Sequence, residues 1–178
     1  MSDTDPPDTI SALTPAQQAA VDAARALVGL SYPDPAYLAA VAPGETPERA
    51  LEMGRESGCA LLWRALNGGT APYRDGSAFS EVWRLAGGVG WRPSGRVRAP
   101  ELPSVGDAIV YDAAGAHPQH VDLCWIGDGQ AVAGGQRTSD GRECVAIVTR
   151  RLAWTGGQLV DETTGRRVMA LISPAEVA

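Results

Sequence analysis

The spacing of the apolar residues changes near Pro103, and this change constrains the fold more than any other feature of the sequence. Before Pro103, apolar residues recur at helical spacing between turn residues. After it come short segments rich in β-branched residues. A chain with its helices first and its strands second predicts an α+β fold, in which the helices pack on one face of an antiparallel sheet. We expect about five or six strands.

Capping signals mark where the expected helices begin. Thr14-Pro15 and Thr46-Pro47 each place a capping side chain before a proline at the first helical position. The first helix is expected to end near Gly29 and the second at about Met53. Further helices are expected over residues 35–41, over residues 59–66 and after Ser77.

Turn residues separate the expected strands, whose segments read GDAIVYD, HVDLCWI, QAVAGG, ECVAIVTRRLAW, QLVD and RVMALI. If Gly127-Asp128-Gly129 is a three-residue hairpin loop, Ile126 pairs with Gln130 and His120 pairs with Gln136. We expect the arginine pairs at 150–151 and 166–167 to be solvated charges at strand edges, where they oppose edge-to-edge pairing.

The 178 residues fit one domain. Residues 1–13 hold few apolar side chains and are expected to form a disordered tail, leaving residues 14–178 as the domain. A net charge of −6 gives no electrostatic basis for binding nucleic acid or an anionic membrane. The N-terminal sequence lacks the basic region and apolar run of a secretory signal, and no apolar stretch approaches a membrane span. We therefore expect a protein that is cytoplasmic as synthesised.

Cys59 follows Ser57-Gly58 at the first turn of an expected apolar helix. Backbone N–H groups and the positive end of the helix dipole favour a thiolate at such a position. The same N–H groups can stabilise an oxyanion, which makes Ser57 and Gly58 candidate oxyanion or substrate contacts. The alternative interpretation is a small buried hydrophobic residue, the usual environment of a free cysteine.

His120 begins the segment HVDLCWI and supplies the base that a thiol nucleophile needs. His117, in the preceding proline-containing loop, suits a surface role better. Two residues are candidates to orient the His120 imidazole. One is Gln136, expected opposite His120, and the other is Asp122, which shares its strand face. The alternative for Gln136 is a surface amide at a strand end.

In order along the chain, SGCALLWRAL, VGDAIVYD, HVDLCWIGDG and QAVAGGQ resemble the motifs of the NlpC/P60 and CHAP peptidases and amidases. ARALVGLSY also resembles the family helix that leads to a tyrosine, here Tyr32. The chain departs from the family in three places. It lacks a Trp-Gly-Gly segment before Cys59, and it has a helical insert at residues 33–54. Where the family has a polar third residue, this chain has Ala133 or Gly134.

The resemblance implies a papain-like domain that cuts peptidoglycan stem peptides as an endopeptidase or amidase, without a metal or organic cofactor. It makes Tyr32 a candidate oxyanion or substrate contact, with packing of its ring as the alternative. The enzyme would reach the wall by lysis or non-classical secretion, and a secreted effector would need an immunity protein. The alternatives are a catalytically inactive papain-like module that binds a peptide or partner protein, and a cytoplasmic cysteine hydrolase of other amides.

The other cysteines suggest no competing site. Cys124 is expected on the strand face of His120 and Asp122, as a core residue. A zinc set of His117, His120, Cys124 and Cys144 matches no closed zinc-finger spacing. Three cysteines are too few for a disulfide framework.

Overall fold

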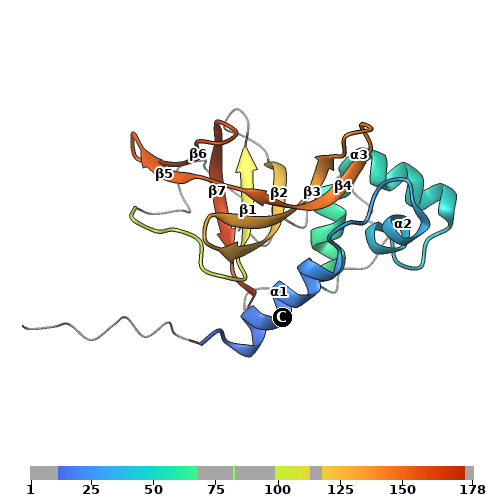
Figure 1. Ribbon diagram of the computed structural model, residues 1–178, viewed down its shortest axis with the longest axis horizontal. Coiled ribbons are helices and arrows are strands. Elements are labelled where there is room, and N and C mark those ends of the chain that lie inside the picture. The colour runs from blue at the N-terminus through green and yellow to red at the C-terminus, as the bar shows by residue number, and fades with distance from the viewer. Residues whose placement is uncertain (1–11, 68–81, 83–98, 113–117, 175–178) are drawn as a thin grey trace, which may run out of the picture.

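The computed structural model describes residues 12–67, 82, 99–112 and 118–174. In these residues, three helices precede one antiparallel sheet of seven strands, so the predicted α+β class is confirmed (Figure 1). The helices are α1 (Pro15–Ala26), α2 (Pro35–Val41) and α3 (Pro47–Leu66). The strands are β1 (Ala108–Asp112), β2 (Pro118–Gly127), β3 (Gln130–Arg137), β4 (Glu143–Thr149), β5 (Leu152–Thr155), β6 (Gln158–Asp161) and β7 (Arg166–Ile172).

The predicted helix starts agree with the structure. Thr14 caps α1 by accepting from the backbone N–H of Gln17, whose side chain accepts from the Thr14 N–H in return. The Thr46 side chain caps α3 by accepting from the backbone N–H of Arg49. Residues 1–11 of the expected tail lie outside the described residues. So does most of the expected helix after Ser77, of which the structure describes Val82, a buried residue.

Helix α3 is interrupted where the sequence suggested two separate helices. Ser57 has φ −155° and ψ 47°, values outside the helical region, and helical backbone lies on both sides of it. The first helical half runs past the expected end at Met53. The interruption matters for the site because Cys59 follows it by two residues.

The sheet is strongly curled. Its strand order is β4-β3-β2-β1-β7-β6-β5, which puts β4 and β5 at opposite edges. Yet only Arg150 and Arg151 separate the end of β4 from the start of β5, a link that spans at most about 11 Å. A flat sheet of this size would be about 29 Å wide at the usual strand spacing. The two edges must therefore approach each other.

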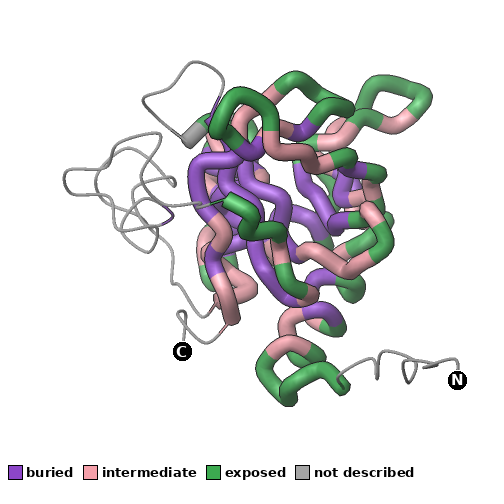
Figure 2. The backbone as a smooth tube through the Cα atoms, turned by 90° about the vertical axis from the view of Figure 1, so that its left-hand side faces the viewer, coloured by how far each residue is buried: buried purple, intermediate pink, exposed green. Residues whose placement is uncertain are grey.

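Two clusters of buried side chains stabilise this arrangement. Helix α3 packs on β2 and β3, and α1 packs on β2, around a large core that contains Leu62, Trp63 and Val121. A smaller cluster of Ile109, Tyr111, Leu159 and Val168 forms around strands β1, β6 and β7. In Figure 2 the buried residues gather in the interior and exposed residues surround them. No helix in the described ranges is long and apolar enough to cross a membrane.

Two of the strand predictions are wrong. The segment at residues 143–154 forms two strands rather than one, which raises the strand count to seven. The β2–β3 turn has two residues, because Asp128 and Gly129 both adopt positive φ (50° and 71°) and Gly127 pairs with Gln130. The predicted pairs Ile126–Gln130 and His120–Gln136 do not form. Bulges lie between Asp122 and Cys124 and between Ala133 and Gln136, and Gln136 pairs with Cys144 instead.

Strand β3 approaches α3 most closely at Gly134. A Cβ atom on Gly134 would lie 3.0 Å from Leu62 Cδ1 and 3.3 Å from Cys59 Cα. A residue without a side chain is therefore needed where the strand meets the helix segment that carries Cys59.

We expect Gly134→Ala to destabilise the protein by about 1–3 kcal/mol, because the added methyl group must push α3 away from β3. Gly54→Ala is the matched control. Its Cβ would meet Tyr32 at an ordinary 3.4 Å, and alanine is favoured in a helix by about 0.5–1 kcal/mol. Urea unfolding measures both variants. Equal stability of the two would contradict the close approach.

Candidate active site

The half-buried Cys59 lies in the first turn after the interruption of α3. Its side chain interacts with that of His120, which β2 contributes. His120 is only 7% exposed, and its ring stacks on that of Tyr111 with 5.9 Å between the ring centroids. The structure therefore brings together the two residues that the sequence proposed as nucleophile and base.

Asp122 binds the other side of the imidazole. Its Oδ1 lies 2.9 Å from His120 Nε2. Because Nε2 is occupied in this way, Nδ1 is the ring nitrogen available to the thiol of Cys59. An imidazole hydrogen-bonded to a carboxylate on one side and a nucleophile on the other has a fixed orientation and tautomer.

The Asp122 carboxylate is completely buried and accepts from three side chains. Arg150 donates through Nε to Oδ2 at 2.7 Å and through Nη2 to Oδ1 at 2.9 Å. The Tyr111 hydroxyl donates to Oδ2 at 2.9 Å. With His120, these contacts use both oxygens twice, so the carboxylate has a single well-defined position.

Arg150 is itself buried, with 7% of its surface exposed. Its guanidinium lies 5.8 Å from the centroid of the Tyr111 ring, and its Nε lies 3.7 Å from Asp161 Oδ2. The prediction of a solvated strand-edge charge is therefore wrong for Arg150. It is also wrong for Arg167, which forms a two-point contact with the buried Asp112 at 3.1 and 3.2 Å. Both arginines compensate carboxylates that the folded sheet buries.

These contacts set the charges of the site. Burial alone would lower the pKa of His120, but the hydrogen bond to Asp122 and the interaction with Cys59 outweigh it and raise the pKa to about 9. Burial alone would raise the pKa of Asp122, but the hydrogen bonds from Arg150 and His120 hold it below its ordinary value. At neutral pH the site therefore contains an imidazolium beside an ionised carboxylate.

Gln136 and Tyr32 are not placed on the imidazole or the thiol. The Gln136 amide donates to the Gly134 carbonyl at 3.1 Å, so the structure puts Asp122 rather than Gln136 on His120. The Tyr32 hydroxyl donates to the Leu51 carbonyl of α3 at 3.3 Å, and its ring packs edge-on against Tyr37. Tyr32 therefore has the packing role that the sequence left as its alternative.

Tyr37 and Glu143 lie beside the interruption in α3, and sequence reasoning missed both. The Tyr37 hydroxyl donates to Glu143 Oε1 at 2.9 Å. A Cβ on Gly58 would lie 2.5 Å from the Tyr37 hydroxyl and 2.7 Å from Glu143 Oε1. The two residues are 106 positions apart and no local pattern links them. Gly58 is therefore required for close packing.

Cys124 has different neighbours from those of Cys59 and His120. The bulge after Asp122 breaks the alternation of β2, and Cys124 joins the large core with Val121 and Leu123. The prediction that it shares the face of His120 and Asp122 is wrong. Burial raises the pKa of its thiol to about 11. The described residues contain no group of three or more potential metal ligands, and His117 lies outside them.

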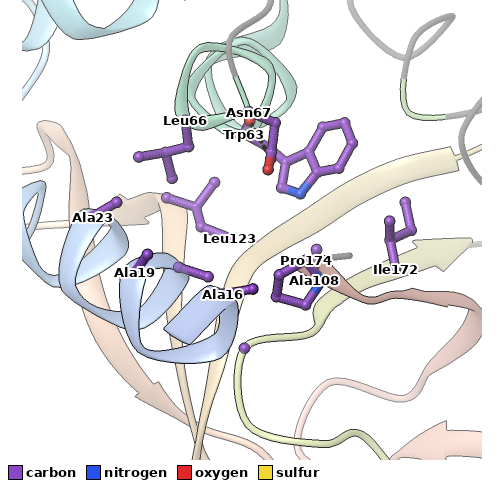
Figure 3. A pocket seen from close by; sticks show the side chains of 12 residues that line it. Ala16, Ala19, Ala23, Trp63, Leu66, Asn67, Ala108, Leu123, Ile172 and Pro174 are labelled. Atoms are coloured by element: carbon purple, nitrogen blue, oxygen red, sulfur yellow. Dashed lines mark hydrogen bonds between the residues drawn. The ribbon is translucent and has the colours of Figure 1, made fainter. Parts of the chain in front are cut away.

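A groove of about 370 Å³ lies elsewhere, between α1, the end of α3 and the sheet (Figure 3). Its walls are apolar and include the alanines of α1, Trp63 and Leu123. Cys59, His120 and Asp122 are not among its lining residues, so its location does not bear on the chemistry of the pair.

The thiol of Cys59 thus lies beside the imidazole of His120, which is hydrogen-bonded to the carboxylate of Asp122. This is the order in which an activated nucleophile, its base and an orienting group are arranged. Comparison of the chain with protein-family models, curated proteins and solved structures gives no match.

We expect Arg150→Met to lower the free energy of unfolding by about 3–5 kcal/mol, because the buried charge of Asp122 loses its partner. Urea unfolding at pH 7 measures this loss. Adding Asp122→Asn to Arg150→Met should recover part of it, since asparagine carries no charge. Arg167→Met, which removes a more exposed arginine, is the control and should cost less. A loss for Arg150→Met no larger than for the control would contradict the role of the pair.

Proposed function

We propose that the protein is a cysteine hydrolase that cleaves amide bonds. The observation that carries the proposal is the half-buried thiol of Cys59 beside the imidazole of His120, which Asp122 holds by a hydrogen bond. A solitary thiol in a protein core is inert, whereas a partly exposed thiol beside a protonated imidazole is a nucleophile. The complete set of three residues favours an enzyme over a binding module without activity.

In this mechanism the Cys59 thiolate attacks the carbonyl carbon of the amide. The oxygen of the tetrahedral intermediate is held by backbone N–H groups at the start of the second half of α3, where Ser57, Gly58 and Cys59 lie. His120 gives its proton to the leaving nitrogen as the C–N bond breaks, which leaves a thioester on Cys59. Neutral His120 then takes a proton from water, whose oxygen attacks the thioester and releases the acid and the thiolate.

Asp122 and Arg150 support this cycle without touching the substrate. Asp122 favours the imidazolium that must form in each turnover, and Arg150 keeps Asp122 ionised and in place. Because both oxygens of Asp122 are held by hydrogen bonds, the carboxylate keeps its position as the partner of the imidazole. A positioned base of this kind contributes about 10²–10⁴-fold to a rate.

The substrate we propose is the stem peptide of peptidoglycan, cut by a papain-like domain. Two features support this proposal. One is the order of a cysteine on a helix before a histidine on an antiparallel sheet, and the other is the resemblance of the motifs around Cys59 and His120 to the NlpC/P60 and CHAP enzymes. Release by lysis or non-classical secretion would bring the enzyme to the wall, and a secreted effector would need an immunity protein.

We expect purified sacculi to release new muropeptides with the wild-type protein and none with Cys59→Ala or His120→Ala. Mass spectrometry of the soluble products identifies the bond that is cut. Cys124→Ala is the control, since it removes a thiol that lies among other core residues and should retain activity. If wild type leaves sacculi unchanged but iodoacetamide labels Cys59 rapidly, the wall substrate is wrong while the cysteine chemistry survives. A slow reaction of Cys59 with iodoacetamide would reject the hydrolase itself.

We expect amide hydrolysis to decline as the pH rises through about 9, because His120 must be protonated to assist the leaving nitrogen. Asp122→Asn should move this limb to lower pH, since it removes a carboxylate that raises the pKa of His120. An NMR titration of the His120 ring protons from pH 5 to 11 gives an independent record of the same ionisation. An alkaline limb that stays in place in Asp122→Asn would contradict the assignment.

A further inference from the structure

Tyr111 on β1 contacts both the histidine and the carboxylate that orients it. Its ring stacks on the imidazole of His120, with 5.9 Å between the ring centroids and 28° between the ring planes. Its hydroxyl donates to Asp122 Oδ2 at 2.9 Å. Only 1% of Tyr111 is exposed, so close packing holds the side chain in this position. Tyr111 therefore acts on the imidazole by two routes, one through the ring and one through the hydroxyl.

The strand register places Tyr111 at this point. In the antiparallel pairing of β1 with β2, Tyr111 lies opposite His120, and in the pairing of β1 with β7 it lies opposite Val168. Residues that lie opposite each other share one face of a sheet, and Asp122, two residues after His120, shares that face as well. Strand β1 is in the middle of the sheet and has a paired strand on each side. The backbone that carries Tyr111 is therefore held from both sides.

The Tyr111 hydroxyl is a permanent donor to Asp122. Burial, followed by the charge of Asp122, raises the pKa of the hydroxyl far above its ordinary value. Two further charges act on it: Arg150, in the link between β4 and β5, lowers this pKa, and Asp161, on β6, raises it. The proton therefore stays on the phenol oxygen, and the hydrogen bond to Oδ2 persists over the whole pH range in which His120 titrates.

The two parts of Tyr111 affect the His120 imidazolium in opposite directions. The hydroxyl takes up part of the negative charge of Asp122, so it weakens the attraction of this carboxylate for the imidazolium proton. The face of an aromatic ring attracts a cation, so the stacked ring favours the imidazolium. Cys59, on α3, also favours the protonated imidazole. Because His120 must still release its proton in each turnover, the Tyr111 hydroxyl eases a step that the other contacts oppose.

We propose that Tyr111 is a positioning residue, which fixes the plane of the His120 imidazole through its ring and limits the hold of Asp122 on the imidazolium proton through its hydroxyl. This inference rests on the proposed function, in which His120 gives a proton to the leaving nitrogen and takes one from water. Tyr111 acts through His120 and Asp122 and not on the substrate. Its two roles are separable, because phenylalanine keeps the ring and removes the hydroxyl alone.

An NMR titration of the His120 ring protons in Tyr111→Phe tests the role of the hydroxyl without any substrate. The chain has two histidines, so a His117→Gln background assigns the signal to His120. We expect the midpoint to move upward by a few tenths of a pH unit, because Asp122 then keeps more of its negative charge. This direction is opposite to the one expected for Asp122→Asn, so a general loss of structure at the site does not imitate it.

Activity gives the second readout. In Tyr111→Phe the alkaline limb of amide hydrolysis should move upward together with the NMR midpoint. The value of kcat should fall by about tenfold, a part of what a positioned base contributes. KM should change little, since Tyr111 acts through His120. Tyr111→Leu also removes the ring, so its midpoint should lie below that of Tyr111→Phe and its kcat should be lower still.

Tyr32→Phe is the matched control. It removes a partly buried hydroxyl that donates to the Leu51 carbonyl of α3, and it should leave the His120 midpoint unchanged. A midpoint in Tyr111→Phe that equals that of the control, or that moves downward, would overturn the role of the hydroxyl. A midpoint in Tyr111→Leu equal to that in Tyr111→Phe would overturn the role of the ring.

The positioning role and the proposed function fail separately, because the NMR titration involves no amide. A protein whose His120 midpoint moves as expected but which cleaves no amide retains the role of Tyr111 and loses the hydrolase. An active enzyme whose midpoint is the same in wild type and Tyr111→Phe retains the hydrolase and loses the role of Tyr111.

Discussion

The buried ion pair between Asp122 and Arg150 is the interaction on which the rest of the site depends. Taking a carboxylate out of water costs several kcal/mol, and the cost is recovered only when a well-placed cation and further hydrogen bonds replace the water. Asp122 has both, since Arg150 contacts each of its oxygens and Tyr111 and His120 complete the shell. The fixed charge of Asp122 then holds the His120 imidazolium in position beside Cys59.

The same pair explains the shape of the sheet. Arg150 occupies the short link between β4 and β5, the two strands at opposite edges. Its guanidinium reaches Asp122 on β2 and approaches Asp161 on β6, and its backbone N–H donates to Gly129 in the β2–β3 turn. One side chain therefore connects strands from both sides of the sheet. Because it is buried, these connections are screened little by solvent and salt.

The sequence was informative wherever a local rule decides the structure. Proline after threonine marked the starts of α1 and α3, and the small residues before Cys59 marked the interruption that positions it. The sequence failed where partners are distant. An arginine inside an apolar segment gave no sign that it would neutralise Asp122, and Tyr37 could not be matched to Glu143 across 106 residues. The sequence could not decide between Gln136 and Asp122 as the partner of His120, because two bulges shift the strand register and bulges have no reliable sequence signature.

The curl of the sheet affects the stage of folding at which the Cys59 thiol becomes reactive. Cys59 and the helix around it are assembled from local contacts, but the imidazolium that activates the sulfur is stabilised only after the two sheet edges meet and Arg150 is enclosed. The sheet also needs the pairing of β1 with β7, which lie far apart in the sequence, and such long-range contacts form late in folding. A partly folded chain therefore exposes an ordinary thiol, and reactivity arises together with closure of the sheet.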